Sequence, residues 1–249
     1  MTYCLALALD DGLVFASDSR SNAGSDYVTT YGKTHVFPLG PDRIFVILTA
    51  GNLATTQEVI NRLRRDVHAG DDRPSLLTVE YLFEAADLVG NVSLDVQEHH
   101  ARGLNRGGAD GSATLIVGGQ IKGEPPQIFM VYPEGNAITA SEETPYLQIG
   151  ESKYGKPILD RLAHRSLTLA DGARLALVSL DATAKSNATV GMPFDVTLYG
   201  VDSYEIAASQ RFGRDSVAYQ ALNETWNEGL QQVFDSLASS VPSEGWYLC

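Results

Sequence analysis

The first twenty residues predict a β-hairpin whose two strands are apolar on both faces. Leu5, Leu7 and Leu9 alternate with small apolar residues, and a second apolar run at 13–16 follows the turn at 10–12. Apolar runs joined by an Asp-Gly turn are typical of paired antiparallel strands. Because neither face carries polar side chains, we expect this sheet to be covered on both sides.

Beyond the hairpin, apolar positions group into strands and then into helices. A polar, glycine-containing stretch at 21–32 predicts a loop. Later in the chain the apolar spacing changes repeatedly between the strand period and the helical period. The pattern predicts strands at 33–37, 43–49, 113–118, 127–132, 146–149 and 194–201, helices at 56–67, 82–96, 157–164, 169–184 and 222–237, and a glycine-rich loop at 102–111.

The order of these elements indicates the fold class. Strands come in groups and helices come mostly in pairs, without strict strand–helix alternation, and this order disfavours a doubly wound sheet. No linker, repeat or low-complexity segment divides the sequence. We therefore expect one α+β domain over residues 1–249, with paired sheets between helical layers.

Composition and charge narrow the classes of partner. The chain has 249 residues, of which 44% are apolar and 20% charged, as is usual for a soluble globular protein. Its net charge of −13 argues against nucleic acid or an anionic membrane surface as a partner. No run approaches the ~18 apolar residues that span a bilayer, and no basic segment precedes the first apolar stretch. We expect a cytoplasmic protein that binds neither nucleic acid nor membrane.

Motifs for metals and cofactors are weak. The pair His99-His100 has no correctly spaced partner for a metal site. The glycines at 107–119 precede a strand, whereas those of a dinucleotide-binding loop follow one. Cys4 fits a buried strand position and Cys249 ends the sequence, which does not indicate a disulfide framework. We expect no cofactor and no metal.

The hairpin brings the start of the chain close to charged residues. With the turn centred near Asp11, opposed residues have numbers that sum to about 20–22, so Thr2 lies opposite the region of Asp18 and Arg20. The next connection, centred near residue 25 or 26, folds Lys33 back toward Asp18. Three successive strands therefore place Thr2, Asp18 and Lys33 in one neighbourhood.

This grouping suits nucleophilic chemistry. A threonine hydroxyl needs a base, and the α-amine of an N-terminal threonine is a known activating base. The Lys33 ammonium would favour the alkoxide, and Asp18 would hold Lys33 in place. The site requires removal of Met1, because a retained methionine leaves Thr2 without a free amine. The alternative is a structural one, in which the charged residues form a salt-bridged strand end.

Gly51 is a second candidate, at the end of the apolar run RIFVILTAG and just before a predicted helix. Backbone N–H groups at a helix start can stabilise a developing oxyanion, and glycine permits close approach of a substrate. The alternative is an ordinary turn at the start of a helix.

Several stretches together resemble the proteasome β-subunit family. They are Thr2 behind the initiator methionine, FASDSRSNAG and GKTHVF in the first forty residues, TAG before a helix, IGESKYGKPILDRL, and LDATAKSNATVGMPFDV. The resemblance covers nearly the whole chain and is strongest to the bacterial branch called Anbu (ancestral β subunit). It implies the four-layer αββα sandwich of N-terminal nucleophile hydrolases, with two antiparallel sheets between helical layers.

The resemblance also implies a role for each candidate residue. Thr2 would be the nucleophile and its α-amine the general base. Asp18 and Lys33 would orient and tune it, Arg20 would support them, and the Gly51 N–H would form the oxyanion hole.

Further roles are implied for the surrounding residues. Ser21, Asn22 and Gly51 would pair with the substrate backbone as an added strand. Asp181 and Ser186 would complete the polar shell around the threonine amine.

The sequence also departs from the family pattern. Gly150-Glu151-Ser152 stands where the family usually has a serine between glycines, and a glutamate cannot supply that hydroxyl. Two extra residues lie between Asp181 and Ser186, and the C-terminal helix and the tail SEGWYLC extend past the usual end of a β subunit.

The leading hypothesis is a threonine peptidase that assembles with copies of itself into rings or related oligomers and cleaves peptide bonds. One alternative is an amidase that acts on small peptides. Another is a non-catalytic assembly subunit, for which Glu151 is the main support. The sequence leaves an ATP-driven partner open.

Overall fold

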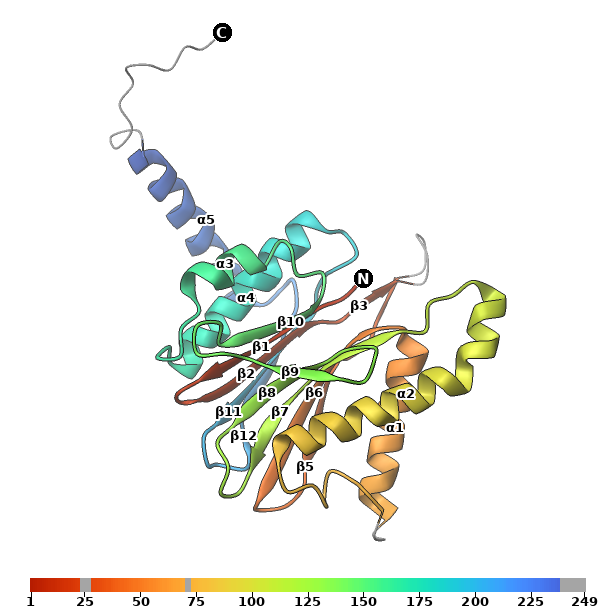
Figure 1. The fold of residues 1–249 in the computed structure, drawn as a ribbon. Helices are drawn as coiled ribbons and strands as arrows, with labels where there is room; N and C mark the ends of the chain where they lie inside the picture. Colours follow the sequence, from red (N-terminus) through yellow and green to blue (C-terminus); the bar gives the residue numbers. More distant parts are fainter. Residues whose placement is uncertain (23–27, 70–72, 238–249) are drawn as a thin grey trace.

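Two five-stranded antiparallel sheets lie face to face in the middle of the molecule (Figure 1). This computed structural model describes residues 1–22, 28–69 and 73–237. The first sheet has the strand order β10-β1-β2-β11-β12. Its strands are β1 (Tyr3–Leu9), β2 (Gly12–Asp18), β10 (Tyr146–Gly150), β11 (Phe194–Gly200) and β12 (Ile206–Phe212).

The second sheet has its strands in the order β5-β6-β7-β8-β9, and a two-stranded ribbon, β3-β4, lies beside the two sheets. In the second sheet the long strands β6 and β7 pair along their whole length. The strands are β3 (Arg20–Asn22), β4 (Val28–Thr30), β5 (Thr34–Pro38), β6 (Arg43–Gly51), β7 (Ala113–Ile121), β8 (Gln127–Val131) and β9 (Ala137–Thr139).

Helices cover the outer face of each sheet. The pair α1 (Leu53–Ala69) and α2 (Leu82–Gly107) packs on the second sheet, and α3 (Lys156–Leu162) lies against α4 (Leu169–Ser186), which packs on the first sheet. Helix α5 (Val217–Leu237) contacts α4 at its start and then projects from the body of the molecule (Figure 1). The layers are therefore α, β, β and α, which confirms the expected α+β sandwich.

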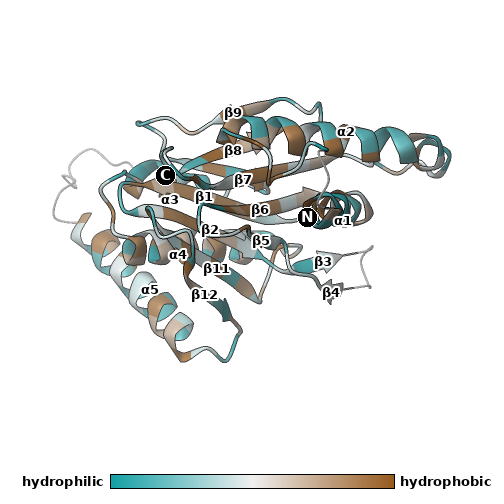
Figure 2. Cartoon of the chain, turned by 90° about the horizontal axis from the view of Figure 1, so that it is seen from below, coloured by the Kyte–Doolittle hydropathy of each residue, from teal (hydrophilic) through white to brown (hydrophobic). Residues whose placement is uncertain are grey.

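Three apolar cores hold these four layers together. Along β1 the side chains of Tyr3, Leu5 and Leu7 face α3 and α4, while those of Cys4 and Ala6 face the second sheet. This alternation explains why both faces of the hairpin are apolar, since each face contributes to a different core. Apolar residues accordingly concentrate on the strands in Figure 2.

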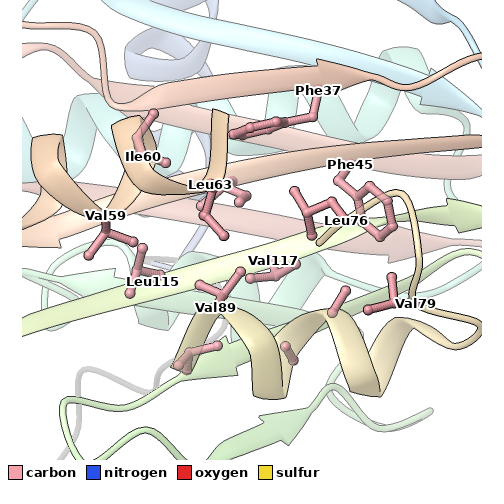
Figure 3. Packing of buried hydrophobic residues seen from close by; sticks show 14 of the residues in the cluster. Phe37, Phe45, Val59, Ile60, Leu63, Leu76, Val79, Val89, Leu115 and Val117 are labelled. Atoms are coloured by element: carbon pink, nitrogen blue, oxygen red, sulfur yellow. The ribbon is translucent and has the colours of Figure 1, made fainter. Parts of the chain in front are cut away.

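The third core lies between the second sheet and helices α1 and α2 (Figure 3). Leu63 from α1 and Val89 from α2 pack against Phe45 and Val117 on the strands. Burying each such side chain contributes about 1.5–3 kcal/mol, so the apolar stripe of each helix holds it on the sheet.

The hairpin and most other elements follow the sequence pattern, but some predictions were wrong. Helix α2 runs to Gly107, so most of the predicted loop at 102–111 is helical; its good helix formers outweigh Gly103, and Gly108 ends the helix with a φ of 64°. The predicted loop at 21–32 contains β4 and most of β3. Strands β9 and β12 have no counterpart in the prediction. The tail at 238–249, with Cys249, lies outside the described residues.

Neither a membrane span nor a metal cluster is found in the described part of the chain. None of its helices combines the length and apolar character needed to cross a bilayer. No group of three or more His, Cys, Asp or Glu side chains among the described residues is placed to hold a metal ion.

Candidate active site

The β1–β2 hairpin places Asp18 beside the start of the chain. Cys4 pairs with Ser17, and continuing this register sets Thr2 opposite Ser19, within the predicted region. Asp18 is completely buried, and its Oδ1 accepts a hydrogen bond of 3.0 Å from the backbone N–H of Tyr3. The carboxylate therefore contacts the residue that follows Thr2.

Lys33, the residue just before β5 of the second sheet, reaches the same carboxylate. Its Nζ lies 2.5 Å from Oδ1 of Asp18 and donates a second hydrogen bond of 2.7 Å to the carbonyl oxygen of Arg20. Oδ2 of Asp18 accepts a third hydrogen bond, of 3.2 Å, from the backbone N–H of Gly191. Lys33 is only 5% exposed, so this ion pair is shielded from water.

Burial and charge compete at Asp18. Burial raises the pKa of its carboxyl group, while Lys33 and the backbone N–H groups of Tyr3 and Gly191 lower it, and the balance leaves the pKa above its ordinary value. The ion pair is therefore held by its surroundings at an energetic cost, as is usual for buried pairs.

The amino terminus lies within the field of this pair. Burial and the Lys33 ammonium hold the pKa of the Met1 amine below its ordinary value, and the carboxylates of Asp18 and Glu151 oppose that effect. Met1 itself is 62% exposed. Because of this lowered pKa, the Met1 amine is deprotonated more readily than a free one.

Gly51 lies at the end of β6 that is close to Lys33. The backbone N–H of Thr49 donates to the carbonyl of Lys33 at 3.0 Å, and Gly51 follows two residues further along. Its φ is 108°, and a Cβ at this position would lie 2.4 Å from the carbonyl oxygen of Ser112, so only glycine fits. Asn52 then caps α1, because its Oδ1 accepts from the backbone N–H groups of Ala54 and Thr55.

Arg20 joins the cluster through its backbone. Its carbonyl binds Lys33, while its guanidinium donates to the carbonyl of Ala188 at 2.8 Å and lies against Gly191. Arg20 thus connects β3 to the segment that follows α4. Ser21 and Asn22 both belong to β3. Of Asn22 the structure describes the backbone only. Among the described residues β3 pairs only with β4, which leaves one edge open to an added strand.

Glu151 lies on the other side of β1. The β1–β10 register pairs Tyr3 with Gly150, and the backbone N–H of Glu151 donates to the carbonyl of Thr2 at 2.7 Å. The glutamate is only 8% exposed, and its Oε2 accepts a hydrogen bond of 3.0 Å from Nδ2 of Asn187. A buried carboxylate thus occupies the position where the sequence pattern of the family has a hydroxyl.

The structure does not bring Asp181 and Ser186 into this cluster. Asp181 accepts a hydrogen bond from the Tyr219 hydroxyl on α5 and pairs with Lys185 at 3.0 Å. Both Asp181 and Ser186 line a cavity of about 520 Å³ between α3, α4 and α5. The helical period of α4 turns Asp181 toward α5, whereas Asn187 and Gly191, which follow the helix end, reach the site.

Sequence reasoning missed the residues that follow α4. Asn187 and Gly191 contact Glu151 and Asp18, and although both lie in the stretch LDATAKSNATVGMPFDV, neither of them was assigned a role from the sequence. One signal could have found them. The helix was predicted to end near 184, and the polar residues and the glycine that follow this helix end can fold back toward the end of a strand.

Comparisons with known proteins agree with this arrangement. A model of the proteasome subunit family matches residues 2–198. A solved Anbu assembly from Pseudomonas aeruginosa, titled a helical assembly, is 42% identical over 100% of both chains, with a TM-score of 0.91. Anbu from Yersinia bercovieri is 40% identical over 98% of this chain and 99% of its own, with a TM-score of 0.89. No curated protein matches the chain.

A third solved structure is a Gly-1 mutant of Anbu from Hyphomicrobium sp. strain MC1. It is 39% identical over 94% of this chain and 97% of its own, with a TM-score of 0.88. The three matches cover 94–100% of this chain.

Proposed function

The chain belongs to the proteasome subunit family, in its Anbu branch, and we propose that it is a threonine peptidase whose nucleophile is Thr2. The observation that carries this proposal is the buried ion pair between Lys33 and Asp18, which lies beside the start of the chain. A structural ion pair would not need to lie within the field of the terminal amine, as this one does.

The reaction begins after Met1 has been removed. The Thr2 α-amine takes the proton of the Thr2 hydroxyl as Oγ1 attacks the carbonyl carbon of a peptide bond, and a tetrahedral oxyanion forms. The Lys33 ammonium stabilises the developing alkoxide, and the Gly51 N–H stabilises the oxyanion. Asp18 keeps Lys33 oriented through their ion pair.

The intermediate then collapses to an ester. The α-ammonium gives its proton to the leaving nitrogen, the C–N bond breaks, and the acyl group remains on Oγ1. Water enters next, the amine takes one of its protons, and the hydroxide attacks the ester carbonyl. When the C–O bond to Thr2 breaks, the ammonium returns the proton to Oγ1 and releases a carboxylic acid.

The substrate is an extended peptide in this proposal. The open edge of β3 and the backbone of Gly51 would pair with it as an added strand, which gives affinity through main-chain hydrogen bonds. Ser21 and Asn22 would contribute the pairing groups on β3.

Intact-mass spectrometry tests the nucleophile. We expect the purified chain to lack Met1 and to gain the mass of one electrophile directed at N-terminal threonine. Thr2→Ala should lose both the adduct and peptide hydrolysis, whereas Thr225→Ala, which changes an exposed threonine on α5, should keep both. A Thr2→Ala protein with full hydrolytic activity would overturn the proposal.

We also propose that copies of the chain assemble. The Pseudomonas aeruginosa relative is described as a helical assembly, and the end of α5 in this chain exposes Leu230, Val233, Phe234 and Leu237 by 50%, 61%, 69% and 49%. Apolar side chains gathered on an exposed helix often mark a contact surface. Sedimentation velocity should show a particle several times heavier than 26.8 kDa, and Phe234→Asp should reduce its mass more than Asp235→Asn. A monomeric wild-type protein at assay concentration would contradict this.

A further inference from the structure

Glu151 is a buried carboxylate with no role in the mechanism described so far. The β1–β10 register sets it opposite Thr2, and the hydrogen bond from its backbone N–H to the Thr2 carbonyl confirms that placement. Opposed residues in an antiparallel pair have Cβ atoms about 4.5–5.5 Å apart. The side chain of Glu151 is therefore within reach of the groups around Thr2.

The orientation of this carboxylate is controlled by Asn187. The Oδ1 of Asn187 accepts hydrogen bonds from the N–H and the hydroxyl of Thr189, at 3.0 and 2.6 Å. Its Nδ2 is thereby directed at Oε2 of Glu151, 3.0 Å away. A buried carboxylate held by one neutral donor is costly unless it has a further partner.

The charged groups around the terminal amine indicate that this amine is the further partner of Glu151. Lys33, Asp18 and Glu151 are the charged groups that act on the amine. Asp18 already accepts hydrogen bonds from Lys33, Tyr3 and Gly191. Glu151, in contrast, accepts only the bond from Asn187 among the described residues, so its carboxylate can accept another donor.

We propose that Glu151 is a positioning residue that accepts a hydrogen bond from the Thr2 α-amine once Met1 has been removed. The proposal rests on Thr2 being the N-terminal nucleophile. The carboxylate orients the lone pair of the amine toward the hydroxyl and stabilises the ammonium that forms when the proton is transferred. Glu151 thus supports the reaction at a position where the family pattern has a hydroxyl.

A Glu151→Gln variant tests this role, because it removes the charge and keeps the shape and an acceptor for Asn187. Without the carboxylate the ammonium is less stable, so the acid limb of the pH profile of kcat/KM should move to lower pH. The plateau should fall roughly tenfold, less than the roughly 10²–10⁴-fold that general acid–base catalysis contributes, because the amine itself remains. Glu143→Gln, an exposed glutamate in the loop before β10, makes the same change in net charge and should leave the profile unchanged. A Glu151→Gln profile that coincides with the wild type would overturn the proposal.

A second measurement separates this inference from the proposed function. The pKa of the Thr2 amine can be obtained from the pH dependence of its acylation by acetic anhydride, followed by peptide mass spectrometry. We expect Glu151→Gln to lower this pKa and Glu151→Asp to give an intermediate value. If the Thr2 hydroxyl forms no adduct and the protein hydrolyses no peptide while the pKa of the amine falls in Glu151→Gln, the proposed function is wrong and the Glu151 contact stands. If Thr2 reacts and the pKa is unchanged, the Glu151 contact is wrong and the nucleophile stands.

Discussion

Two lysine–aspartate pairs of this molecule differ in what surrounds them. The Lys33–Asp18 pair has side chains that are 6% and 0% exposed, whereas in the Lys185–Asp181 pair the lysine is 51% exposed and the aspartate 8%. Asp18 also accepts two backbone hydrogen bonds, from different segments of the chain. Asp181 accepts one from a tyrosine hydroxyl on the neighbouring helix.

The difference shows that burial of an aspartate does not by itself indicate a catalytic site. Both aspartates are buried and both have an ammonium partner. Only Asp18 joins a strand end of one sheet to a lysine of the other, next to the amino terminus. The pair on α4 instead fastens α4 to α5, which is a structural role.

The largest contrast is expected from removing each lysine. Lys33→Met leaves a buried, unpaired carboxylate, which costs about 3–5 kcal/mol of the free energy of unfolding. It should also reduce peptide hydrolysis on the order of a thousandfold, because the nucleophile loses its charged neighbour. Chemical denaturation and initial rates measure both effects.

Lys185→Met is the matched control for that experiment. Its ammonium is half exposed, so the change should cost less than about 1 kcal/mol and leave hydrolysis unchanged. Equal losses of activity in the two variants would remove the distinction between the pairs.

A smaller effect is expected at Gly51, which lies near the Lys33–Asp18 pair. Gly51→Ala places a Cβ on a residue with a positive φ and brings that atom against the Ser112 carbonyl. The change should lower the free energy of unfolding by about 1–3 kcal/mol. A displaced oxyanion donor should reduce kcat by roughly 10²–10³-fold. Gly229→Ala is the control on α5, where an added Cβ meets no atom within 4 Å. This variant should have a slightly higher free energy of unfolding and keep full activity. Wild-type kcat in Gly51→Ala would exclude its N–H from the oxyanion hole.

The smallest effect concerns the pH dependence of stability. Because the pKa of Asp18 is raised in the folded state, folded chains keep its proton to higher pH than unfolded chains do. Its contribution is present below the unfolded pKa and is lost as pH rises through the folded pKa. The unfolding free energy of the wild type minus that of Asp18→Asn should therefore fall as pH rises from about 4, the unfolded value. A difference that rises with pH would mean that Lys33 and the backbone donors lower the pKa of Asp18 by more than burial raises it.

Local patterns in the sequence were sufficient for the hairpin, most of the helices and the approach of Thr2, Asp18 and Lys33. The tight turn leaves few registers open to the hairpin, and the β3–β4 ribbon returns the chain to Lys33. The same patterns missed β9 and β12, and they ended α2 too early because glycines were given more weight than its helix formers.

Only the tertiary structure decided which later residues reach the site. The contact between Gly191 and Asp18 spans 173 positions, and the contact between Asn187 and Glu151 spans 36. Both depend on where α4 ends and on how it packs over the first sheet. A shift of a few residues along that helix turns a side chain from the site toward α5, as Asp181 shows. The sequence by itself therefore determined that Thr2, Asp18 and Lys33 come together, while packing decided that Asn187 and Gly191 contact Glu151 and Asp18.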